Sequence, residues 1–231
     1  MMQQLIDKQK YVIYLIIFLL LSSVNNINLT KFREKVSSLK IIQVEGLNKN
    51  LNNKIKRDLD FLINSNIYKL NNEIISNKLD KYNYIDNYKV FKEYPSKIKI
   101  ELVQAKFLAE TIKNNQRYFI GSNGKLIDYK IFNYKENIPN VFGNFTSKDF
   151  IELNEVLKKT NFKFEHIQDI FFYPSGRWDI KTKKNLILKL PRKNVYKAID
   201  KFNLISKNEE LKEYNVIDLR IPNQLILSNE Q

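Results

Sequence analysis

The chain has 231 residues, enough for one or two compact domains, and its hydrophobic fraction of 43% is sufficient for folded cores. It contains 39 Lys and Arg against 25 Asp and Glu, with one His, five Gly and no Cys. The lack of Cys excludes disulfides, zinc–thiolate sites, iron–sulfur clusters and thiol nucleophiles. A single His also excludes a His-rich metal site, so we expect no cofactor, no metal and no enzyme.

The net charge of +14 does not by itself indicate a nucleic-acid partner. Nucleic-acid binding requires Lys and Arg concentrated on one face, whereas here they occur in every segment, interleaved with Asp and Glu. Lys, Asn and Ile are all overused, and AT-rich codons raise all three together. We therefore expect no nucleic-acid partner, and weak attraction to an anionic surface such as lipid headgroups fits the charge better.

The N-terminal part contains an apolar run, Tyr11–Leu21, preceded by Lys8 and Lys10. A membrane-spanning helix needs ~20 mainly apolar residues, and an extension to Ile27 supplies about that length. We therefore predict a cytoplasmic tail over 1–10, a transmembrane helix over 11–27 and a linker over 28–40. The alternative is a cleaved signal peptide, against which stands the lack of an Ala-x-Ala-like cleavage site.

The region 41–104 is predicted to fold as a small α+β domain. A strand over 41–46 is followed by two helical stripes and then by strands over 88–94 and 96–104. The stripes consist of Leu51, Ile55, Leu59 and Leu62, and of Ile74, Ile75, Leu79 and Tyr82. This order predicts two helices that cover one face of a three-stranded sheet.

The region 105–228 is predicted to be a mainly antiparallel β domain with two helices, followed by a tail over 229–231. The expected strands cover 107–112, 116–120, 125–128, 167–172, 177–182, 185–190, 214–219 and 224–228. One helix should follow the cap at Thr146 and Ser147. The other should carry the apolar positions Val195, Ala198, Phe202 and Ile205.

Few residues in the chain suggest chemistry. His166 lies near Glu165 and Asp169, but no Ser or Cys motif accompanies it, so a partly buried or surface histidine is the simpler interpretation. Trp178 lies on an alternating run and is predicted to be a core residue. Asp218 and Arg220 lie one pleat apart on a strand, where they are either solvated or fix the register of a partner.

Several motifs resemble those of a known family. The run Ile41–Gly46 resembles the opening strand of a polypeptide-transport-associated (POTRA) domain, and Val90–Ala105 resembles its closing segment in the FtsQ/DivIB cell-division proteins. Four further runs resemble motifs of that family in the order expected: Phe119–Asp128, Ile138–Gly143 (an "L-P-x-V-x-G" turn), Gly176–Pro191 and Val216–Leu227. The chain departs from the family pattern at Val103-Gln104, at the turn near 184–185 and at Ile221.

The resemblance implies a single-pass protein of the inner membrane at the division septum, with its N-terminus in the cytoplasm and its POTRA and β domains in the periplasm. It implies a non-enzymatic scaffold with no small-molecule substrate that binds FtsB, FtsL and other divisome membrane proteins and links them to septal peptidoglycan synthesis. The alternatives are a membrane-anchored envelope hydrolase and an outer-membrane assembly or secretion component. The latter usually carries POTRA domains in tandem or with a barrel.

The partner-binding surface is predicted at the last strand. A terminal strand can lie at a sheet edge, where unpaired backbone groups accept a strand from another chain. In the family, the closing strand accepts a strand of FtsB. The resemblance therefore implies these contact residues: Arg220, Ile221, Asn223, Gln224, Leu225, Ile226, Leu227, Ser228 and, more weakly, Arg177.

Overall fold

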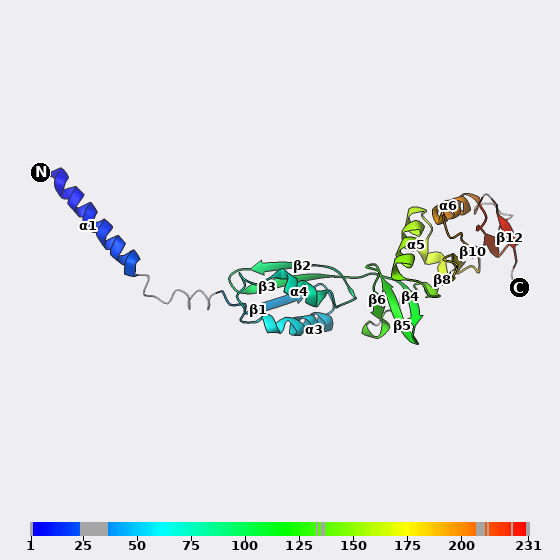
Figure 1. The fold of residues 1–231 in the computed structure, drawn as a ribbon, viewed down its shortest axis with the longest axis horizontal. Coiled ribbons are helices and arrows are strands. Elements are labelled where there is room, and N and C mark those ends of the chain that lie inside the picture. Colours follow the sequence, from blue (N-terminus) through cyan, green and yellow to red (C-terminus); the bar gives the residue numbers. More distant parts are fainter. Residues whose placement is uncertain are drawn as a thin grey trace. The chain divides into compact units, whose positions relative to one another are not determined.

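The computed structural model describes residues 2–23, 37–132, 134, 137–206, 211, 213–222 and 224–229. The chain divides into two compact units (Figure 1). One comprises Met1–Leu79 with Lys89–Glu101, and the other comprises Asp80–Tyr88 with Leu102–Gln231. The sequence suggests one cut after residue 104, whereas the observed units interleave, because the segment Asp80–Tyr88 belongs to the second one.

The N-terminal helix α1 covers Met2–Ser23. Among the residues described, no helix combines the length and the apolar character that crossing a membrane requires. The transmembrane helix predicted over 11–27 is therefore not found. The physical reason is that the first half of α1 is polar, so its continuous apolar run is Tyr11–Leu21. Residues 24–27 and most of the predicted linker lie outside the described residues.

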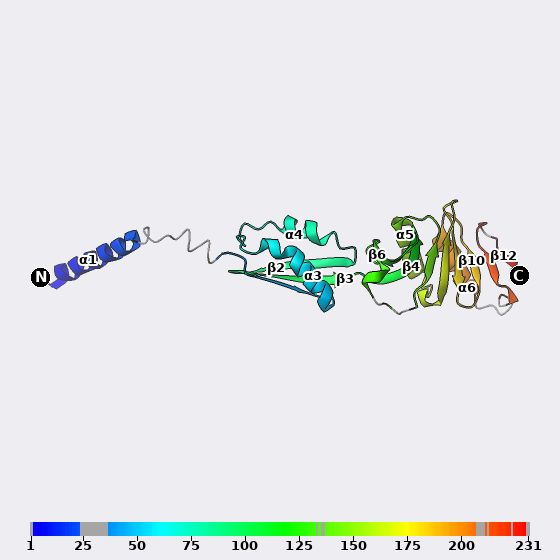
Figure 2. The ribbon, with the colours of Figure 1, turned by 90° about the horizontal axis from the view of Figure 1, so that it is seen from below.

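The region 41–104 has the predicted βααββ order, although the start of its second strand and the end of its third belong to the second unit. Its elements are β1 (Ile41–Glu45), α3 (Lys49–Leu59), the 3-10 turn η2 (Asp60–Leu62), α4 (Asn72–Leu79), β2 (Ile85–Glu93) and β3 (Lys97–Gln104). In the described residues the strands form a sheet of order β1-β3-β2, in which β1 runs parallel to β3. Figure 2 shows α3 and α4 with this sheet.

The helices of the first unit follow from their apolar spacing. Asn48 caps α3, since its side chain accepts a hydrogen bond from Leu51 N at 2.9 Å. The buried apolar side chains of the two helices and of β3 are Leu51, Ile55, Leu59, Leu62, Ile75, Leu79, Ile98, Ile100 and Leu102. The predicted stripe on α4 is wrong at its ends: Ile74 is 44% exposed, and Tyr82 lies beyond the helix.

The second unit contains a mixed sheet and two helices. Its strands are β4 (Phe107–Lys113), β5 (Gln116–Gly121), β6 (Leu126–Asp128), β7 (Asn140–Phe142), β8 (Ile167–Phe172), β9 (Trp178–Thr182), β10 (Ile187–Lys189), β11 (Val216–Asp218) and β12 (Ile226–Ser228). The helices are α5 (Ser147–Lys159) and α6 (Val195–Ile205). Within the described part of the chain the strand order is β12-β11-β10-β9-β8-β7-β4-β5-β6.

One face of this sheet carries the core. A row of paired residues crosses five strands and is almost fully buried: Val141, Ile170, Ile180, Leu188 and Ile217. Phe150 and Leu153 of α5 and Ile199 and Phe202 of α6 belong to the same buried cluster. Because side chains alternate along a strand, the residues next to this row point to the opposite face.

The strand β7 differs from the prediction of a turn over Ile138–Gly143. Asn140–Phe142 pair in parallel with both β4 and β8. Three residues are too few to show an alternating pattern, which is why the sequence does not reveal this strand. Gly143 ends it with a φ of 108°, and a Cβ at this position would lie 2.2 Å from the carbonyl oxygen of Phe172. The close approach of β8 therefore requires glycine here.

Candidate functional site

The last strand lies at one end of the large sheet (Figure 2). β12 pairs antiparallel with β11 through Val216↔Ser228, Ile217↔Leu227 and Asp218↔Ile226. In the described residues β11 is its only neighbour. Its other side therefore presents backbone groups with no strand beside them, which is the arrangement that β-augmentation needs.

The side chains of β12 alternate between the two faces of the sheet. Leu225 and Leu227 are half-buried and pack against the core cluster, whereas Ile226 is 44% exposed on the opposite face. The alternation anchors the strand from one side and leaves an apolar side chain available on the other. The strand is shorter than predicted, because Gln224 and Leu225 lie just before it, and Asn223 lies outside the described residues.

Arg220 is held by an acidic residue of its own chain. Its Nε lies 2.9 Å from both carboxylate oxygens of Asp218, and its backbone N–H donates to Asp218 Oδ1 at 2.9 Å. The side chain of Arg220 is 40% exposed and that of Asp218 10%. Hydrogen bonds from Arg220 hold the pKa of the Asp218 carboxyl below its usual value. Any carboxylate of a partner therefore meets a guanidinium that is already paired but still accessible.

Arg177 belongs to a second charged pair nearby. Its Nε lies 3.7 Å from Asp179 Oδ1, too far for a hydrogen bond, and its guanidinium carbon lies 4.3 Å from the ring centre of Tyr173. Both Arg177 Nε and Asp179 Oδ1 are buried, and neither finds a hydrogen-bond partner among the residues that the structure describes. Burial raises the pKa of Asp179, while the nearby charges of Arg177, Lys189 and Arg220 oppose this increase.

The structure thus brings Arg177 and Arg220, two of the predicted residues, to one acidic centre. Strand pairing places Asp179 of β9 opposite Lys189 of β10, and Lys189 opposite Asp218 of β11. The same register continues to Ile226 of β12. The result is a row of charged residues on the sheet face opposite the core, and this row ends at the edge strand β12. We call it the charged row, defined by Asp179, Lys189 and Asp218.

The sequence interpretation missed Lys189 and the burial of Asp179. Alternation assigns both to the polar side of their strands, but only the register of neighbouring strands shows that they face each other. The pairing of Asp179 with Lys189 follows from the register of the consecutive strands β9 and β10, whereas the pairing of Lys189 with Asp218 has no local signal, since it depends on the parallel crossover through α6. By contrast, the prediction that Trp178 lies in the core is confirmed, because the residue is 6% exposed and packs against Phe172.

The sole histidine is a surface residue. The side chain of His166 is 63% exposed and lies 3.8 Å from Glu165, while Asp169 accepts a hydrogen bond from Asn140 at 3.0 Å. Among the residues described, no group of three His, Asp or Glu side chains is placed to hold a metal ion.

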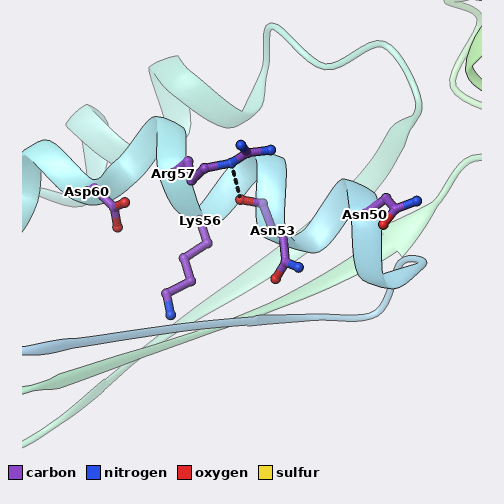
Figure 3. Close-up of a pocket in the computed structure, with 5 residues that line it drawn as sticks. All are labelled: Asn50, Asn53, Lys56, Arg57 and Asp60. Carbon is purple, nitrogen blue, oxygen red and sulfur yellow. Dashed lines mark hydrogen bonds between the residues drawn. The ribbon is translucent and has the colours of Figure 1, made fainter.

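A surface hollow of about 560 Å³ lies along α3 (Figure 3). Its lining is polar and consists of Asn50, Asn53, Lys56, Arg57 and Asp60. Arg57 Nε donates to the carbonyl oxygen of Asn53 at 3.4 Å, which folds the side chain along its own helix. The described residues that line the hollow are all polar or charged, so it is the solvated face of α3.

Two family models match this chain in sequence order. "POTRA domain, FtsQ-type" matches residues 37–104, and "Cell division protein FtsQ/DivIB, C-terminal" matches residues 111–220. The fold and the two matches define a class of proteins in which a POTRA domain precedes a larger β domain. The chain belongs to the FtsQ/DivIB family, whose members are cell-division proteins.

Curated relatives agree with this assignment. The chain is similar to proteins called cell division protein FtsQ from Rickettsia typhi (27% identical over 165 residues) and Rickettsia prowazekii (26% over 197 residues). These alignments cover 69% and 83% of this chain and 60% and 67% of the relatives. A third FtsQ, from Bradyrhizobium diazoefficiens, is 23% identical over 71% of this chain and 48% of its own length. The chain thus spans about half to two thirds of the length of these relatives.

A solved structure is also similar to part of the chain. It is the major extracytoplasmic domain of the trans isomer of the cell-division protein DivIB from Geobacillus stearothermophilus. The match covers 46% of this chain and 95% of that one, with a TM-score of 0.34 and 11% sequence identity.

Proposed function

We propose that this protein is a non-enzymatic scaffold of the divisome that binds FtsB, FtsL and other division proteins and couples them to septal peptidoglycan synthesis. The single observation that carries the proposal is the exposed final strand β12, which has one strand neighbour within the described residues. The family membership supports a role in cell division, and the resemblance of the closing motif supports FtsB as the partner of this strand.

The chemistry of the edge suits a strand from another chain. Main-chain hydrogen bonds to β12 supply affinity, and pockets for alternate side chains supply specificity. Ile226 offers an exposed apolar contact on the open face, and Ile221, 46% exposed, lies just before the strand. Arg220 is paired with Asp218, which lies opposite Ile226 of β12, so an acidic side chain of the partner would compete with or extend the Asp218–Arg220 pair.

We also propose that α1 keeps the protein at the inner membrane, with the N-terminus in the cytoplasm. Its support is the apolar run Tyr11–Leu21 of α1, which follows Lys8 and Lys10. N-terminal sequencing of the protein from cells tests this proposal. A mature chain that begins near Asn25 would show cleavage instead.

The binding proposal is tested by blocking the edge of β12. Adjacent residues of a strand direct their N–H groups to opposite sides, so we would compare Ile226→Pro with Leu227→Pro, each of which removes one donor and obstructs the strand. The variant whose proline faces outward should lose binding to the extracytoplasmic part of FtsB while its β domain remains folded. Fluorescence of Trp178, the only tryptophan, reports on that domain.

Ile226→Thr is the matched control, because threonine retains the backbone donor and favours strands. It should bind FtsB within about threefold of the wild type, since one partly exposed apolar contact is worth less than ~1 kcal/mol. Normal FtsB binding by both proline variants, each with native Trp178 fluorescence, would contradict the proposed interface. Depletion of the protein should also give filamentous cells with unconstricted septa.

A further inference from the structure

A basic groove lies beside the exposed strand. It has a volume of about 320 Å³ and lies between the N-terminal half of α6 and the segment Leu219–Gln224. Gln224, which lines it, precedes β12 by two residues. The groove is therefore continuous along the chain with the edge proposed to bind a partner strand.

Four cationic side chains line this groove, and no carboxylate of the described residues does. Lys197 and Lys201 are four residues apart on α6 and so share one side of that helix, Lys193 lies just before the N-cap residue Asn194, and Arg220 lines the groove with them. Arg220 is neutralised by Asp218, whereas the described residues supply no ion pair for the three lysines. Asp200, the acidic residue of α6, is exposed and does not line the groove.

Between these cations the floor of the groove is apolar. It is formed by Pro191, Ala198, Leu219, Ile221 and Pro222. An extended chain can lie on such a floor with its methylene groups against the prolines and its acidic groups against the lysines. A small hydrated anion would leave this apolar surface uncovered.

The spacing of Lys197 and Lys201 along α6 matches that of alternate residues in an extended polypeptide. Residues four apart in a helix are separated by ~6 Å along its axis, and residues two apart in a strand by ~6.6 Å. Alternate side chains of a strand can therefore each lie opposite a helix lysine at every fourth position.

We propose that this groove binds an acidic, extended segment of the same partner whose strand pairs with β12, with carboxylates at alternate positions. The inference rests on the proposed function, because the groove becomes part of the interface only if β12 accepts a strand. A partner strand that continues past the Gln224 end of β12 would run into the groove, which favours a polypeptide over a lipid headgroup.

The probe is a labelled peptide in which glutamate and threonine alternate, bound to the full chain at low salt and followed by fluorescence anisotropy. Replacing Lys193, Lys197 and Lys201 together with Glu should weaken binding at least about tenfold, and higher salt should weaken wild-type binding. An isomeric peptide with all its glutamates in one block should bind the wild type several-fold more weakly.

The matched control replaces Lys148, Lys158 and Lys159 of α5 with Glu, which changes the net charge equally and should leave affinity within about twofold. Equal losses in the two triple variants would overturn the groove as a site. Equal binding of the two peptide isomers would overturn the spacing. Lysine-dependent binding to phosphatidylglycerol vesicles, with none to either peptide, would assign the groove to lipid and overturn the proposal.

The test separates this inference from the proposed function. If the groove variant binds both the peptide and FtsB normally while the edge-blocking proline variant loses FtsB, the groove proposal fails and the strand interface stands. If the proline variants retain FtsB while the groove variant loses the peptide, the strand interface fails instead.

Discussion

At the scale of single residues, the pair of Asp218 and Arg220 determines how the charged row responds to pH. The folded-state pKa of Asp218 is lowered, so the carboxylate contributes stability above its ordinary value near ~3.9, and this stability is lost as the pH falls through the folded-state value. Asp179 acts in the opposite sense, because burial raises its pKa and its charged form costs stability at neutral pH.

Asp218→Asn should lower the free energy of unfolding of the β domain at pH 7 by about 1–2 kcal/mol, because Arg220 loses its charged acceptor while 40% of its side chain stays in water. The difference from the wild type should shrink as the pH falls well below ~4, where the native carboxylate also protonates. Urea unfolding followed by Trp178 fluorescence measures it. Asp200→Asn, at an exposed site, is the control, and a difference that does not change with pH would contradict the assignment.

At the scale of secondary-structure elements, most of the fold can be predicted from local patterns. The helical spacing of Leu51, Ile55 and Leu59 predicts α3, and the alternation of Ile98, Ile100 and Leu102 predicts β3; the burial of all six confirms both elements. Local sequence patterns do not predict an element that is too short to show a period, and they do not predict which residues of neighbouring strands face each other. Three-residue β7 carries no period. The edge position of β12 is given by its pairing with β11 at the end of the strand order, and its contact with the charged row depends on the register of that pairing.

Leu59→Ala tests the core of the first unit. Leu59 is fully buried, so the change should cost ~2–5 kcal/mol, from lost transfer free energy and from the cavity left behind. The amide signals of Ile98 and Ile100 in a urea titration of the full chain report on this unit. Ile74→Ala, at a 44% exposed position of α4, should cost less than ~1 kcal/mol. Similar losses in the two variants would show that Leu59 does not anchor the core.

At the scale of the whole molecule, the boundary between the two compact units differs from the boundary between the two family matches at the segment Asp80–Tyr88. It lies within the residues matched as POTRA, yet it belongs to the second compact unit. Asn123 fixes it there: its amide nitrogen donates to the carbonyl oxygens of Asn83 and Ile85, both at 2.9 Å. Ser122 adds a hydrogen bond to Asp86 at 2.9 Å.

Asn123→Ala should therefore release this segment. Two carbonyl oxygens lose their donor, so we expect a loss of about 1–2 kcal/mol and faster exchange of the amide of Ala105, which donates to Tyr84 O at 2.9 Å. Hydrogen exchange by NMR measures the effect at residue resolution. Asn144→Ala, at an exposed position of the same unit, should leave the exchange of Ala105 unchanged. Unaltered protection of Ala105 in Asn123→Ala would refute the role of Asn123.

The three-residue strand β7 is a point at which the large sheet can separate. It is the link in the sheet between β4 and β8, through two paired residues on one side and three on the other. Loss of an edge strand removes one strand from a sheet. Separation at β7 instead divides this sheet into a block of three strands, β4 to β6, and a block of five, β8 to β12. A pulling force applied to β12 would therefore be carried across β7, and the hydrogen bond from Thr111 to the carbonyl oxygen of Val141 lies at the point where the sheet would part.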